Sequence, residues 1–121
     1  MGNNGSGLLI TTQGKIHRYN VDSLESLQKA VGGYIEVIVP RVAIRAGSFN
    51  PDVILIVDEE GVLKSKEVNK LATLLAGMVI VGDVVIAKVS GEDIVNFTNR
   101  ELIQVENQCK RLLGLLTGAE A

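Results

Sequence analysis

The stretch LQKAVGGYIEVIV, residues 27–39, changes its hydrophobic period at a pair of glycines. Apolar residues before the glycines recur at the spacing of a helix face: Leu24, Leu27, Ala30 and Val31. Asp22 and Glu25 have the three-residue spacing of a capping box, so we expect the helix to begin at Asp22. Gly32 suits the left-handed position that ends a helix, whereas Gly33 has no evident structural duty and stays a candidate ligand contact.

Beyond the glycines, apolar residues alternate, which predicts a strand that ends at Pro40. Its two faces carry Ile35, Val37 and Val39 on one side and Tyr34, Glu36 and Ile38 on the other. Arg41 and Arg45 share one face of a further short extended piece. Residues 46–51 then have the composition of a loop.

An N-terminal hairpin and a buried strand are predicted next. Residues 8–12 and 15–21 are β-rich runs on either side of Gly14, as in a hairpin. Residues 53–57, VILIV, form a continuous apolar run, which is typical of a central strand buried on both faces.

A second helix is expected to begin at residues 65–66 and to end at Gly77, because apolar residues recur at helical spacing between them. Residues 78–81 and 84–89 flank Gly82-Asp83, a two-residue connection with the leading glycine of a type II′ turn. This pattern predicts a second hairpin.

Thr98 and Glu101 form a second capping box, which opens a predicted helix to about residue 116. Its apolar stripe consists of Leu102, Val105, Cys109, Leu112 and Leu116. The stripe lasts about two heptads, too few for a coiled coil, so we expect the helix to pack on its own domain, with a dimer through it as the alternative.

Together these elements predict an α+β fold, a small and mainly antiparallel sheet with two short helices and a longer C-terminal helix. We expect a flexible N-terminus at residues 1–7, a core domain at 8–97, and at 98–117 an amphipathic helix that packs on the core or on a partner subunit.

Composition narrows the possible partners. The 121 residues carry a formal net charge of −2 without a basic tail, and the few aromatic residues leave little for bases to stack on, so we expect no duplex DNA partner. One histidine, His17, and one cysteine, Cys109, argue against a disulfide or a zinc site, and we expect no metal or cofactor. Without a long apolar run or a signal-peptide pattern, we expect a cytoplasmic protein that does not bind membranes.

No phosphate-loop motif and no catalytic set occurs, and His17 has no partner that spacing identifies, so we expect no enzymatic activity. The candidate ligand-binding residues are Gly33, Tyr34, Glu36, Arg41, Arg45 and Asn69.

Each candidate also has a purely structural interpretation. Glu36 lies inside a strand and needs a partner, which is either an arginine on a solvated sheet face or the hydroxyl or amine groups of a ligand. Each of Arg41 and Arg45 alone is explained by solvation at the surface. Together they stand about 13 Å apart, a span that suits a diphosphate-sized ligand or a subunit interface better than one phosphate. Asn69 is an ordinary exposed polar residue unless its helix face lines a cleft.

Four segments carry a resemblance to a known family: residues 23–36, 53–64, 69–72 and 80–83. Over about residues 15 to 100 the chain resembles a small, uncharacterised domain family of bacteriophages, plasmids and mainly Gram-positive bacteria, with the signature Leu-Gln-x-x-Val-Gly-Gly-x-Ile-Glu. Family members typically have Asn-Glu-x-Gly where this chain has DEEG, residues 58–61.

The resemblance implies a genomic setting in which small phage proteins sequester nucleotide signals of bacterial defence systems. Our first hypothesis is therefore a non-enzymatic homo-oligomer that binds such a signal, with Arg41 and Arg45 at phosphates and Tyr34 or Glu36 at base or ribose. The alternative is a protein-interaction module that inhibits or regulates a host protein through the last helix or a sheet edge. A weaker third hypothesis is a hydrolase of such signals that uses Glu36 and Asp83.

Overall fold

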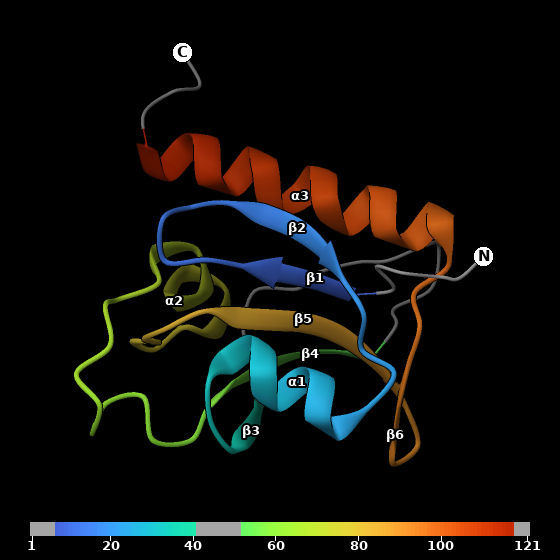
Figure 1. Ribbon diagram of the computed structural model, residues 1–121. Helices are drawn as coiled ribbons and strands as arrows, with labels where there is room; N and C mark the ends of the chain where they lie inside the picture. The colour runs from blue at the N-terminus through green and yellow to red at the C-terminus, as the bar shows by residue number, and fades with distance from the viewer. Residues whose placement is uncertain (1–6, 41–51, 118–121) are drawn as a thin grey trace.

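A computed structural model describes residues 7–40 and 52–117 of the chain. Within these residues an antiparallel six-stranded sheet carries three helices (Figure 1). The strands are β1 (Gly7–Ile10), β2 (Ile16–Tyr19), β3 (Ile35–Ile38), β4 (Asp52–Asp58), β5 (Val84–Ser90) and β6 (Asp93–Val95). The helices are α1 (Leu24–Val31), α2 (Lys70–Ala76) and α3 (Asn99–Thr117). The predicted α+β class, with a longer C-terminal helix, is confirmed.

The strand order is β2-β1-β5-β4-β3, which leaves β2 and β3 at the two edges. β5 is the most heavily paired strand, because β1 and the short strand β6 share one of its sides and β4 occupies the other. The N-terminal hairpin of β1 and β2 is confirmed, and so is the interior position of β4.

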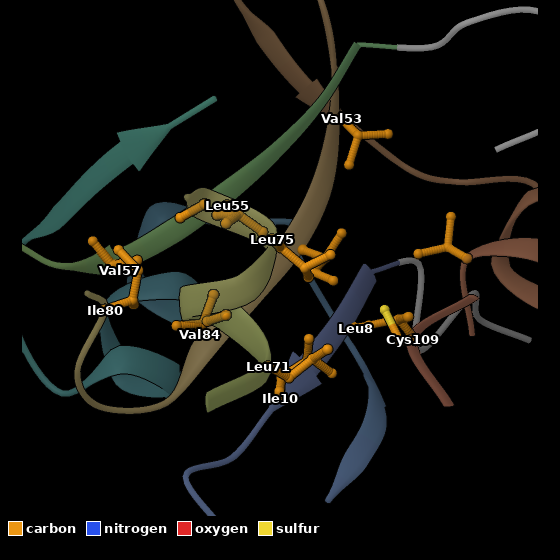
Figure 2. Packing of buried hydrophobic residues seen from close by; sticks show 14 of the residues in the cluster. Leu8, Ile10, Val53, Leu55, Val57, Leu71, Leu75, Ile80, Val84 and Cys109 are labelled. Carbon is orange, nitrogen blue, oxygen red and sulfur yellow. The ribbon is translucent and has the colours of Figure 1, made fainter. Parts of the chain in front are cut away.

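Side chains of β4 alternate between two apolar cores, which confirms that the run at 53–57 is buried on both faces. Val53, Leu55 and Val57 pack against α2 and α3, while Ile54 and Ile56 pack on the side of α1. Figure 1 shows α1 in front of β4 and β5, with α2 behind the sheet. Figure 2 shows the larger core, in which side chains from β1, β4, β5, α2 and α3 converge.

Helix α1 ends as predicted but begins one residue late. Gly32 closes it in the left-handed conformation at φ 81°, and its N–H donates to the carbonyl of Gln28. The N-cap is Ser23, whose side chain accepts a hydrogen bond from Ser26 N, so the prediction of a cap at Asp22 was wrong. A serine hydroxyl caps as well as a carboxylate, and spacing alone could not choose between the two neighbours.

The second helix and the second hairpin both differ from prediction. α2 begins at Lys70 because Asn69 is its N-cap, which is four to five residues later than expected. Residues 78–81 do not pair with β5, whose sides are already occupied by other strands; they lie against the residues before α2 through a single bridge between Val68 and Val81. The partner of β5 that the pattern missed is β6, across a turn at Gly91.

Helix α3 has the predicted cap and packs on its own domain. Thr98 N donates to Glu101 and Glu101 N donates to the Thr98 hydroxyl, which completes the capping box. Glu101 also accepts hydrogen bonds from Lys88 on β5. Of the predicted stripe, Leu102, Val105 and Cys109 are fully buried, Leu112 is partly buried and Leu116 is exposed. The first three turns of the helix therefore supply its buried core residues, and Leu112 and Leu113 pack against the core from the fourth turn.

Candidate functional site

Asp58, the last residue of β4, carries a buried carboxylate. Asp58 is only 5% exposed, and its Oδ2 lies 2.6 Å from Lys66 Nζ and 2.9 Å from Lys64 Nζ. Its Oδ1 accepts a hydrogen bond from Glu60 N at 2.8 Å. Acidic residues of turns are ordinarily solvated, so the burial of Asp58 does not follow from the sequence pattern.

The same two lysines satisfy carbonyl groups at the end of α1. Lys66 Nζ donates to Val31 O at 2.6 Å, and Lys64 Nζ donates to Gly32 O at 3.0 Å. These carbonyls belong to the last turn, whose oxygens lack helical partners and carry partial negative charge. Two ammonium groups thus offset the partial negative charge at the end of α1.

Gly33 has a steric reason to be glycine. A Cβ atom there would lie 2.6 Å from Asp58 Oδ1 and 2.6 Å from Lys64 Nζ. Gly33 is not among the residues with positive φ, so the requirement is close approach and not backbone conformation. The second glycine of the pair accommodates the ion pair between Asp58 and Lys64.

Burial of the Asp58 carboxyl group opposes its ionisation, but hydrogen bonds from Lys66, Lys64 and Glu60 N outweigh burial and lower its pKa from 3.8 to about 2. Since the folded-state pKa is the lower one, folding favours the ionised group. The associated stabilisation is complete above pH 4 and is lost as the pH falls toward 2.

We expect the Asp58→Asn variant to lose this part of the acid sensitivity. The difference in free energy of unfolding between wild type and variant should shrink by at most about 2 kcal/mol between pH 5 and the most acidic measurable condition. Urea unfolding at a series of pH values measures it, with Glu59→Gln, an exposed neighbour, as the control. Wild-type and Asp58→Asn stabilities that fall in parallel would contradict the assignment.

Beside the ion pair lies a cavity of about 390 Å³, which we call the Lys29 cleft. It is lined by Thr12, Lys29, Ala30, Val31, Gly32, Lys66, Glu67, Gly82 and Asp83. The lining therefore combines two ammonium groups with two carboxylates. Gly82 has a φ of +82°, and a Cβ atom there would lie 2.9 Å from Lys66 Cδ. Glycine at position 82 therefore leaves room for the Lys66 side chain.

Thr12, in the turn between β1 and β2, donates hydrogen bonds to both carboxylates of the cleft. Its N–H donates to Asp83 Oδ1 at 3.1 Å, and its hydroxyl donates to Glu67 Oε1 at 3.3 Å. Each carboxylate has further acceptor capacity beyond these bonds. Lys66 donates to Val31 O and to Asp58, which leaves one of the three hydrogens of its ammonium group for another acceptor.

The predicted site residues do not meet in this cleft. Tyr34 is 68% exposed, and Glu36 is exposed beside a smaller hollow of about 120 Å³ between β3 and residues 78–81. Arg41 and Arg45 lie outside the described residues, so their pairing with Glu36 and their role at phosphates stay predictions.

Asn69 is buried, so the interpretation as an ordinary exposed residue was wrong. The alternative, that it lines a cleft, agrees with its place in the lining of a hollow of about 200 Å³ between the β1–β2 turn, α2 and α3. Its Oδ1 accepts from Ala72 N at 3.1 Å as the N-cap of α2. Its amide nitrogen donates to Ile10 O at 3.0 Å and to Gly82 O at 2.9 Å. The residue joins β1, α2 and the start of β5, and only the tertiary fold reveals it.

The single thiol of the chain, that of Cys109, is buried. Burial raises the pKa of the Cys109 thiol to about 12, which keeps it protonated and unreactive. Across residues 7–40 and 52–117 there is no group of three or more histidine, cysteine or acidic side chains that could hold a metal ion. No helix in this part of the chain is long and apolar enough to cross a membrane.

A family model matches residues 6–110, and that family is described only as a domain of unknown function. The search of curated proteins gave no match, and neither did the search of solved structures. The match spans every helix and strand of the fold except the last turns of α3.

Proposed function

We propose a function from the geometry of this chain itself, because the chain belongs to the DUF3846 family, whose shared domain has no known function. The proposal is non-enzymatic binding of a small nucleotide-derived molecule in the Lys29 cleft. The observation that carries it is the lining of that cleft, where Lys29 and Lys66 stand in one cavity with Glu67 and Asp83.

The volume and the charges of the cleft support a ligand of this class. About 390 Å³ lies within the range of small-molecule sites. A nucleotide presents phosphate oxygens that accept from ammonium groups, together with hydroxyl and amine groups that donate to carboxylates. Both complementary groups line the cleft.

More specifically, we propose that the protein sequesters a nucleotide-derived bacterial immune signal, as the family resemblance suggests. Sequestration requires that the ligand is bound and later released without chemical change. Calorimetry with cyclic ADP-ribose isomers and cyclic di- and trinucleotides tests binding, and mass spectrometry of the ligand after denaturation of the complex tests for chemical change. An absence of heat with every one of these compounds would overturn the proposal.

Lys29→Gln is expected to weaken binding of such a nucleotide by about tenfold, because one charge-assisted hydrogen bond to phosphate is lost. Lys29 is exposed on the last turn of α1, so the fold should not change. The matched control is Lys110→Gln, on an exposed position of α3 that does not line the cleft. Equal affinities of the two variants would place the ligand elsewhere.

The second candidate function is interaction with a host protein, through a sheet edge or the C-terminal helix. It is favoured by exposed apolar side chains around the hollow beside Glu36: Val62 at 77%, Met78 at 55% and Val79 at 65%. A pull-down from host lysate with wild type and Val79→Lys tests it. A stoichiometric partner lost only in the variant would favour this function over ligand binding.

A further inference from the structure

The outer edge of β3 is open in the described part of the chain. β3 pairs with β4 on one side, and no strand within residues 7–40 and 52–117 pairs with its other side. Figure 1 shows β3 at the end of the sheet opposite to β2. An unpaired strand edge presents a row of hydrogen-bonding groups, and proteins usually protect such edges with charges, proline or bulges.

The hydrogen bond from Glu59 N to Tyr34 O, 2.8 Å, fixes which backbone groups face outward. It makes Tyr34 a hydrogen-bonded partner of β4, and the alternation of an antiparallel ladder then directs Glu36 and Ile38 to β4 as well. The N–H and C=O groups of Ile35, Val37 and Val39 consequently point away from the sheet. Pro40 lacks an N–H, but by the same alternation its backbone nitrogen points to the β4 side, so it does not interrupt the row of outward-facing groups.

Apolar side chains accompany the open edge. Val37 is 49% exposed and Val39 is 74% exposed, both on the face of the sheet that carries α1. Ile35 on the same face is partly buried against the α1 core. Glu36 is the one charged side chain of the strand. The edge therefore has little of the charge that would keep another strand away.

We propose that β3 pairs with β3 of a second copy of this chain, antiparallel and centred on Val37. A twofold axis perpendicular to the sheet keeps each face continuous, so only registers that join residues of the same parity are allowed. One such register sets Glu36 opposite Glu36 of the other copy, which is destabilising. The next sets Val37 opposite Val37, Ile35 opposite Val39, and Glu36 opposite Ile38.

The register centred on Val37 satisfies both requirements of the edge. It joins the outward-facing residues as hydrogen-bonded pairs, and it keeps the two carboxylates away from each other. The apolar pairs lie on the face of the sheet that carries α1, and valine and isoleucine are favourable cross-strand neighbours. The side chains of β3 thus suit those of a second, antiparallel β3, and for this reason we choose a second copy of the chain over an unrelated partner. The Lys29 cleft takes no part, so this inference does not depend on the proposed function.

Sedimentation velocity over a range of protein concentrations tests the proposal. The wild type should form a reversible dimer, and Val37→Lys should weaken dimerisation by about tenfold or more, because two ammonium groups would face each other. The matched control is Val68→Lys, a valine outside β3 that is 48% exposed, and this variant should dimerise normally. Circular dichroism confirms that both variants are folded.

Crosslinking tests the register. Opposed hydrogen-bonded residues have Cα atoms about 5.5 Å apart, within disulfide range, so Val37→Cys should form a disulfide dimer under mild oxidation. Glu36→Cys should not, and Cys109 is buried and stays out of the reaction. A monomer at every concentration would overturn the proposal. So would a dimer insensitive to Val37→Lys, efficient crosslinking through Glu36→Cys alone, or a different protein bound stoichiometrically at this edge.

Discussion

Asn69→Asp is expected to lower the free energy of unfolding by about 4 kcal/mol at neutral pH. The aspartate keeps the oxygen that caps α2 but replaces the amide that donates to Ile10 O and Gly82 O. Two carbonyl oxygens then face a carboxylate at a position only 1% exposed. Only one of its oxygens keeps a donor, Ala72 N, and a buried charge that is incompletely hydrogen-bonded is much more costly than a lost neutral hydrogen bond.

Asn69→Ala is the comparison that isolates the charge. It removes the cap and both donated bonds without adding a charge, and should cost about 2–3 kcal/mol. The aspartate variant should also recover stability relative to wild type below pH 4, because burial raises the pKa of an unpaired carboxyl group and its protonated form can donate one bond. Urea unfolding measures both variants, and Asn99→Asp, at the exposed start of α3, serves as the control. Equal losses for Asp and Ala, without pH dependence, would contradict the assigned contacts.

Local sequence patterns predicted the parts of the fold that depend on neighbours in the chain. Gly32 as the end of α1 and the box of Thr98 and Glu101 follow from helix-terminus chemistry within a few residues. The buried β4 follows from its uninterrupted apolar run. In each case the residues that decide the structure are adjacent in sequence.

The errors arose where pairing is decided at long range. Gly82-Asp83 has the pattern of a hairpin turn, but β1 and β4 occupy β5, so the preceding residues cannot pair with it. The later start of α2 likewise depends on Asn69, whose amide bonds cross to Ile10 in β1. No local pattern contains that contact.

The candidate site was harder to predict than the fold. Asp58 resembles any acidic turn residue in sequence, and only its two lysines, six and eight residues later, hinted at an ion pair. The Lys29 cleft assembles side chains from four separate segments, so spacing could not identify it. Gly33 shows the same limit, because the atoms that require a glycine there come from Asp58 and Lys64.

Gly33→Ala is expected to cost about 3 kcal/mol of unfolding free energy. The added methyl group would lie 2.6 Å from Asp58 Oδ1 and from Lys64 Nζ, closer than real contacts allow. Lys64 can swing away because its side chain is partly exposed, whereas Asp58 is held by Lys66 and by Glu60 N. Relief of the clash must therefore break part of the ion pair or shift the turn before β3.

A double-mutant cycle separates these contributions. In a Lys64→Ala background one of the two obstructing atoms is gone, so Gly33→Ala should cost about half as much, a coupling of about 1 kcal/mol or more. Gly91→Ala is the control for backbone conformation: its Cβ would meet nothing within 4 Å, but its φ of +63° should cost about 1 kcal/mol. Strict additivity of Gly33→Ala and Lys64→Ala would mean that the glycine pair does not accommodate the ion pair, and the second glycine would again lack a physical explanation.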